Sequence, residues 1–112
     1  MTDRVRVVIA DDQAFVRSAL RLILEGAPDL TVLGEAADGQ GALDAARRLR
    51  PDIILLDLHM PGRDGVWASE QISELVPEVK ILVLTAFDTD RLVSSALRAG
   101  AVGFLLKDSS PE

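Results

Sequence analysis

The sequence predicts an α/β fold in which helices cover both faces of a parallel β-sheet. Five short, β-rich apolar runs alternate along the chain with stretches whose apolar residues recur at helical spacing, which is typical of repeated βα units. A polar residue follows four of the five runs directly. The predicted strands are residues 5–10, 30–36, 53–56, 80–84 and 102–106.

Length and composition indicate one cytoplasmic domain spanning residues 1–112. The chain is 48% hydrophobic, but no apolar stretch approaches the roughly 20 residues that cross a membrane, and the N-terminus lacks a signal-peptide pattern. The absence of cysteine excludes disulfides and thiol catalysis. Eighteen acidic against 12 basic residues give a net charge of −6, which opposes DNA binding by this chain alone.

The first predicted helix ends at Gly26 and Pro28. Its apolar residues recur at i, i+3, i+4, i+7 and i+8 and form one face. They are Val16, Ala19, Leu20, Ile23 and Leu24.

The second helix is expected from about residue 41 to residue 49, because the position before Pro51 disfavours helical geometry. Its inward residues are Ala42, Ala46 and Leu49.

The third helix is expected over about 64–76, closed by Pro77. Val66, Ile72 and Val76 face inward, and Ser69 interrupts this apolar stripe.

The fourth helix is expected over about 89–99, with Asp88 as its N-cap and Gly100 as its stop. Its inward residues are Val93, Ala96 and Leu97.

The polar residues at the strand ends should meet at one edge of the sheet. They are Asp11 and Asp12 after the first strand, Asp57 after the third, Thr85 after the fourth and Lys107 after the fifth. Ligands of open parallel sheets bind outside the carboxyl ends of the strands. A flavodoxin-like strand order of 2-1-3-4-5 would bring these four strand ends into one crevice.

Asp57 is the most informative of these residues because it ends a core strand. Desolvating a carboxylate costs several kcal/mol unless a cation or hydrogen bonds compensate. Together with Asp11 and Asp12 it offers the oxygen ligands that Mg²⁺ prefers. Zinc is disfavoured, since the chain has one histidine, His59, and no cysteine.

The same group of residues suits phosphoryl chemistry. Lys107 could neutralise a phosphoryl group, the Thr85 hydroxyl could donate to it, and Asp57 could attack phosphorus to form an aspartyl phosphate. Each residue also has an ordinary structural explanation: helix capping for the Asp pair, solvation for Lys107 and β-propensity for Thr85. Their joint placement on four strands favours a phosphoryl and Mg²⁺ site.

From Val5 to Lys107 the chain resembles the receiver domain of two-component response regulators, which has the CheY-like form of this fold. In that family an acidic pair after the first strand binds Mg²⁺, and an aspartate after the third accepts a phosphoryl group from a histidine kinase. A hydroxyl residue and a lysine complete the site. The matching residues are Asp11 and Asp12, Asp57, Thr85, and Lys107.

The resemblance implies further roles. His59 would give its backbone carbonyl to the metal, and Thr85 and Phe104 would be the two switch residues. Phe104 has no hydroxyl, so packing alone must set its inward or outward preference. Receivers typically have proline after the lysine, whereas this chain has Asp108, which leaves the geometry of that loop open.

Two stretches resemble the NarL/FixJ branch with LuxR-type output: residues 6–13 and residues 103–108. This resemblance implies the N-terminal receiver of a transcription regulator with a helix-turn-helix domain beyond this chain. Phosphorylation would control dimerisation and DNA binding, and the domain would catalyse its own phosphorylation and dephosphorylation rather than act as a metabolic enzyme. The alternatives are a standalone phosphorelay or protein-binding receiver, and an Mg²⁺-dependent aspartyl-phosphate phosphatase.

The last residues, Ser110-Pro111-Glu112, resemble the start of a fifth helix that is cut off, although a frayed polar tail has similar composition. Without that helix, apolar surface on the first helix and the last strand should be exposed.

Overall fold

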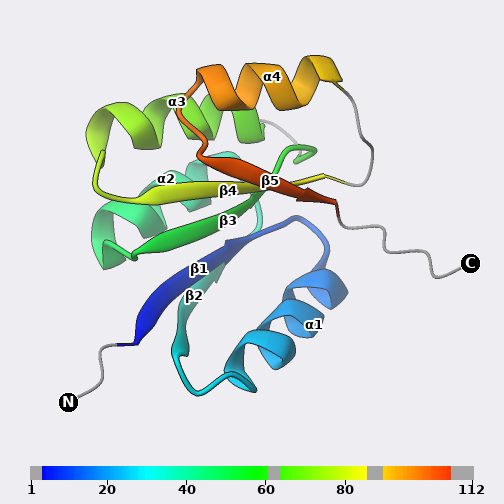
Figure 1. The fold of residues 1–112 in the computed structure, drawn as a ribbon, viewed down its shortest axis with the longest axis vertical. Coiled ribbons are helices and arrows are strands. Elements are labelled where there is room, and N and C mark those ends of the chain that lie inside the picture. Colours follow the sequence, from blue (N-terminus) through cyan, green and yellow to red (C-terminus); the bar gives the residue numbers. More distant parts are fainter. Residues whose placement is uncertain (1–3, 61–63, 86–89, 107–112) are drawn as a thin grey trace, which may run out of the picture.

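A computed structural model describes residues 4–60, 64–85 and 90–106 of the chain. The strands form one parallel sheet in the order β2-β1-β3-β4-β5, which confirms the predicted fold class and strand order (Figure 1). The strands are β1 (Val5–Ala10), β2 (Leu30–Ala36), β3 (Ile53–Asp57), β4 (Lys80–Thr85) and β5 (Gly103–Leu106).

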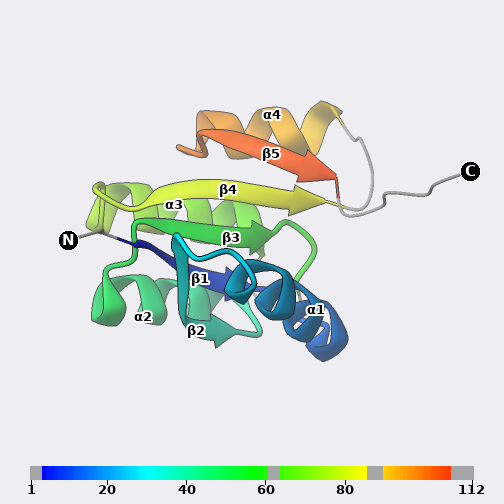
Figure 2. The ribbon, with the colours of Figure 1, turned by 60° about the horizontal axis from the view of Figure 1, so that its bottom comes forward.

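Helices cover both faces of this sheet. They are α1 (Ala14–Glu25), α2 (Gly39–Leu49), α3 (Gly65–Leu75) and α4 (Asp90–Arg98). Figure 2 shows α1 in front of the sheet and α2 and α3 behind it. In the described part of the chain, none of the helices is long and apolar enough to cross a membrane.

Each face of the sheet carries its own apolar layer. The larger layer joins the sheet to α2, α3 and α4 and is nearly sealed, with Ile54, Leu56 and Ile72 at 0% exposure. The smaller layer lies under α1, where Leu20 and Leu24 pack against a buried cluster that includes Val7 and Ile9.

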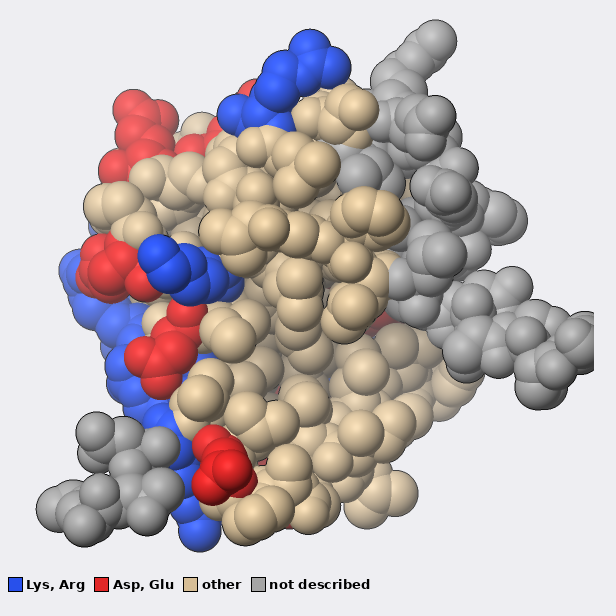
Figure 3. Space-filling model, viewed as in Figure 1, with Lys and Arg blue, Asp and Glu red and all other residues tan. Residues whose placement is uncertain are grey.

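The α1 side of the sheet is less well covered. Phe15 and Ile23 on α1 are 71% and 69% exposed, and Phe104 and Leu105 on β5 are 40% and 49% exposed. The exposure expected on the first helix and the last strand is therefore present. A groove of about 320 Å³ runs between these two elements. Figure 3 views this side, where charged residues gather toward the left edge and uncharged ones cover most of the middle.

The predicted helix ends are largely confirmed. α2 begins at Gly39 rather than near residue 41, because the Asp38 carboxylate accepts a hydrogen bond from the Gly41 amide (2.7 Å) and caps the helix. The helix ends as expected before Pro51, with Arg50 in the left-handed region at φ 46°. Asp64 caps α3 by accepting from the Trp67 amide (2.9 Å).

One inward assignment was wrong. Leu97 is 42% exposed, since Ala96 takes the inward position of α4 at 0%. Ser69, the polar residue that interrupts the apolar stripe of α3, is itself buried at 0% exposure. Asp88 lies outside the described residues, as does the side chain of Val93.

Gly100 ends α4 in a conformation that only glycine adopts freely. Its φ is +119°, and a Cβ atom there would collide with the Ser73 side chain on α3. The glycine thus permits both the turn into β5 and the close contact of α3 with that turn.

We expect Gly100→Ala to lower the free energy of unfolding by about 1 to 3 kcal/mol, because it adds both backbone strain and a clash. Urea denaturation would measure this loss. Gly26→Ala is the matched control, since Gly26 also follows a helix but has φ −74°, and a Cβ atom there would make only ordinary van der Waals contacts, the nearest at 3.4 Å from the Ile23 carbonyl oxygen. That variant should stay within about 1 kcal/mol of the parent. Equal losses of unfolding free energy in both variants would show that the conformation and close contact of Gly100 are not the cause.

Candidate functional site

Three carboxylates converge at the carboxyl edge of the sheet. β1 and β3 are neighbours with Ala10 opposite Leu56, so Asp11 and Asp57 emerge side by side. One carboxylate oxygen each from Asp11, Asp12 and Asp57 lies within 4.8 Å of the other two. Asp11 and Asp57 are 0% and 2% exposed, whereas Asp12 is exposed. The sequence prediction that these three residues meet is thus borne out by the geometry.

Backbone amides hold the two buried carboxylates. The Gln13 amide donates to Oδ1 of Asp11 (2.9 Å), and the His59 amide donates to Oδ1 of Asp57 (3.2 Å). The Leu58 amide donates to the Leu84 carbonyl (3.0 Å), which ties the chain after β3 to β4. The carboxylates are therefore fixed by the loops that carry them as well as by the strands.

Gly65 lets α3 begin directly against the phosphoacceptor candidate. Its amide donates to the Leu58 carbonyl (3.3 Å), and a Cβ atom at this position would collide with the Asp57 carbonyl and lie 2.7 Å from the Leu58 Cα. At Gly65 the space that a side chain would need is therefore filled by the protein's own backbone.

The donor set fits a hard divalent cation. Three carboxylate oxygens at this spacing match the preference of Mg²⁺ for oxygen ligands, and like charges held this close are stabilised by a cation between them. Neither aspartate is the N-cap residue of α1, which is Gln13, although the Asp11 carboxylate accepts a hydrogen bond from the Gln13 amide.

The other predicted site residues are only partly described. Thr85 ends β4 opposite Leu106 of β5, so its backbone reaches the same edge, but its side chain is outside the described part. Lys107 and Asp108 also lie outside the described residues. The side chain of His59 is exposed, while its amide contacts Asp57. Phe104 points outward at 40% exposure.

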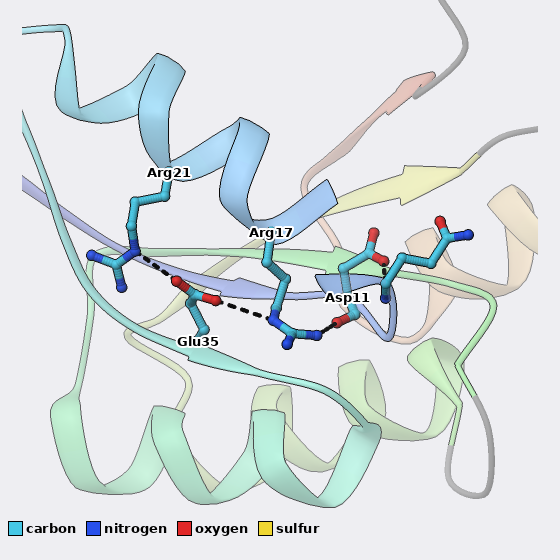
Figure 4. A network of polar contacts seen from close by, with 5 residues as sticks. Asp11, Arg17, Arg21 and Glu35 are labelled. Atoms are coloured by element: carbon cyan, nitrogen blue, oxygen red, sulfur yellow. Dashed lines mark hydrogen bonds and ion pairs between the residues drawn. The ribbon is translucent and has the colours of Figure 1, made fainter. Parts of the chain in front are cut away.

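The sequence did not single out a charged network beside the carboxylates. Arg17 on α1 donates to the Asp11 carbonyl (2.7 Å) and to Glu35 at the end of β2 (3.1 Å), as Figure 4 shows. Arg21, one turn further along α1, donates to the other oxygen of Glu35 (2.6 Å). The only signal for this network was the i, i+4 spacing of the two arginines.

This network lowers the pKa of Glu35 below its usual range. The largest cause is the hydrogen bond from Arg21, partial burial opposes it, and Arg17 adds to the lowering. Because the folded-state pKa is depressed, the ionised carboxylate stabilises the fold at pH values above the unfolded pKa. That stabilisation is lost as the pH falls through the folded-state pKa.

We therefore expect Glu35→Gln to reduce stability by up to about 1 kcal/mol near neutral pH, a value typical of partly exposed ion pairs. The difference from the parent chain should shrink as the pH falls below about 4.3, the usual pKa of glutamate. Urea midpoints of both chains across this pH range would show the convergence. A difference independent of pH would mean that the charge of Glu35 contributes nothing.

Comparison with known proteins identifies the class. The family model of the response regulator receiver domain matches residues 7–112, and the chain belongs to this family. It is 46% identical over 110 residues to the uncharacterized transcriptional regulatory protein YxjL of Bacillus subtilis, covering 98% of this chain and 50% of that protein. The chain therefore spans about half the length of this relative.

Solved structures agree with this assignment. The receiver domain of the putative response regulator NarL from Mycobacterium tuberculosis matches with a TM-score of 0.91 and 38% identity, over 96% of this chain and 87% of that one. A complex of CheX, CheY, BeF3 and Mg²⁺ from Borrelia burgdorferi matches with a TM-score of 0.85 and 28% identity, over 92% and 78%. The similarity to YxjL and NarL confirms the resemblance to the NarL branch.

Proposed function

We propose that this chain is a phosphorylation switch in which Asp57 accepts a phosphoryl group from a histidine kinase. The observation that carries the proposal is the convergence of the Asp11, Asp12 and Asp57 carboxylates at the carboxyl ends of β1 and β3. Membership of the receiver family supports it, as does the similarity to a CheY structure with BeF3 and Mg²⁺.

The proposed step is an in-line transfer at phosphorus. A carboxylate oxygen of Asp57 forms the new P–O bond while the P–N bond to the kinase histidine breaks, and the released imidazole keeps the electron pair of that bond and takes up a proton. Hydrolysis of the aspartyl phosphate by water returns the free carboxylate and inorganic phosphate. The His59 amide donates to Asp57 Oδ1 and so helps to orient this carboxylate.

Asp11, Asp12 and Asp57 would hold Mg²⁺ with the backbone carbonyl of His59. The bound cation would supply charge neutralisation for the incoming phosphoryl oxygens. Thr85 and Lys107 are proposed to contact those oxygens, which the position of Thr85 at the end of β4 supports. Thr85 and Phe104 would then report the phosphorylated state, since both lie on strands next to the site.

The proposed output belongs to a longer protein. Residues 1–112 would be the receiver unit of a cytoplasmic transcription regulator that forms homodimers on phosphorylation and binds DNA through a C-terminal helix-turn-helix domain. Two facts support this: the chain spans half of a relative named as a transcriptional regulatory protein, and its own net charge of −6 is unsuited to a phosphate backbone.

Incubation with acetyl phosphate and Mg²⁺ should add the mass of one phosphoryl group to the intact chain, because acetate is a good leaving group and the site catalyses the transfer. Intact-mass spectrometry would detect the adduct, and chelation of Mg²⁺ should abolish it. Asp57→Asn should show no adduct. Asp52→Asn is the matched control, because Asp52 precedes the same strand at its opposite end and is exposed.

These measurements test separately whether the chain is phosphorylated and whether Asp57 is the acceptor. A folded parent chain that acquires no adduct would overturn the proposed switch. An adduct that persists in Asp57→Asn would overturn Asp57 as the acceptor while leaving the phosphoryl chemistry in place.

A further inference from the structure

We infer that Arg17 is a positioning residue for the metal site: its guanidinium fixes the main chain of Asp11 so that the Asp11 carboxylate faces Asp12 and Asp57. This inference rests on the proposed function, since it takes the carboxylate cluster as an Mg²⁺ site. Arg17 lies on α1 and is not itself a candidate ligand.

The contacts of Asp11 show how it is held. Its amide donates to the Ala36 carbonyl (3.0 Å), its carboxylate accepts from the Gln13 amide (2.9 Å), and its carbonyl accepts from Arg17 (2.7 Å). The first contact ties Asp11 to β2 and the second shapes the turn. The third links the residue to α1 and restrains rotation of the Asp11–Asp12 peptide group.

Glu35 orients the Arg17 side chain. The Nε of Arg17 donates to one Glu35 oxygen at 3.1 Å, while a second nitrogen of the same planar group reaches the Asp11 carbonyl. A guanidinium offers several donors in a fixed plane, so one partner sets the direction in which it reaches the other. The Arg17 side chain is 20% exposed, less than the 35% of Arg21, so solvent screens its contacts less.

A register shift in the sheet puts Glu35 on the correct face. Val7 pairs with Val32, but Val8 pairs with Gly34, so Leu33 is an extra residue in β2. After this irregularity Glu35 lies opposite Ile9, whose side chain belongs to the layer under α1. With regular alternation from Val32, Glu35 would face α2 instead.

The loss of the Arg17 charge and the loss of its positioning contact should change the Mg²⁺ affinity in opposite directions. A positive side chain near a cation site repels Mg²⁺, so loss of its charge alone would tighten metal binding. Loss of positioning would weaken it, because the Asp11 carbonyl and carboxylate are then free to reorient. The sign of the change in Mg²⁺ affinity therefore distinguishes positioning from a simple charge effect.

Arg21 provides the matched comparison. It also lies on α1 and also donates to Glu35, at 2.6 Å, but its second hydrogen bond goes to Glu25 (2.9 Å), where that of Arg17 goes to the Asp11 carbonyl. Arg21→Ala should therefore disturb the docking of α1 about as much as Arg17→Ala while leaving the Asp11 carbonyl contact intact.

The test is an Mg²⁺ titration of the 112-residue chain followed by amide NMR shifts. The Gln13 and His59 amides are direct reporters, since they donate to the Asp11 and Asp57 carboxylates. Arg17→Ala should weaken Mg²⁺ binding about tenfold, as loss of an outer contact to a metal ligand does. Arg21→Ala should bind close to the parent value, and Arg17→Lys should fall between, because one ammonium cannot hold both partners in the same fork.

Unchanged or tighter Mg²⁺ binding in Arg17→Ala would overturn the inference, as would equal weakening in Arg17→Ala and Arg21→Ala. If Arg17→Ala does not fold, Arg17→Lys is the deciding variant because it keeps the positive charge. An Mg²⁺ affinity equal to that of the parent in Arg17→Lys would overturn the positioning role of Arg17. A parent chain whose Gln13 and His59 amides do not respond to Mg²⁺ would overturn the metal site itself and the inference with it. A parent that binds Mg²⁺ while Arg17→Ala matches it would overturn the inference alone.

Discussion

The removal of two carboxylates from water at the ends of adjacent strands is the constraint around which this molecule is arranged. Asp11 and Asp57 are almost fully buried and lie beside exposed Asp12. Removing a carboxylate from water costs free energy and like charges repel one another, so such an arrangement depends on hydrogen-bond donors and on a cation. The backbone amides of Gln13 and His59 supply two of the donors. The remaining demand for positive charge suits a divalent cation such as Mg²⁺, whose preferred ligands are oxygens.

The parallel sheet meets this constraint by supporting the site from several described elements. β1 and β3 bring the acids together, β4 receives the Leu58 amide, and α3 begins against the Asp57 backbone through Gly65. α1 contributes from the opposite face through Arg17. Elements packed on both faces of the sheet therefore contact the residues that carry these carboxylates.

Much of this arrangement could be predicted from the sequence. Apolar runs fixed the five strands, and the polar residues following them located the carboxylate cluster, because parallel strands expose their carboxyl ends at one edge. The error at Leu97 arose because periodicity does not reveal which helix face meets a neighbouring element. The close approach of α3 to the Asp57 backbone at Gly65 could not be predicted, since a sequence cannot show how near a helix will come to a strand. Thr85, Lys107 and Phe104 keep their roles as predictions.

The Arg17–Glu35 contact was beyond sequence reasoning for a specific reason. Regular alternation along β2 would place Glu35 against α2, and only the pairing of the strands reveals the extra residue at Leu33.

Because of that extra residue, the number of residues in β2 decides which face of the sheet Glu35 occupies. Deleting one residue between Val32 and Glu35 would rotate the Glu35 carboxylate into the apolar layer beneath α2, beside residues such as Leu49, where a charge has no solvent. Among descendants of this chain, β2 should therefore accept exchanged side chains far more readily than a gained or lost residue. Changes of length are better tolerated in the turns on either side of the strand.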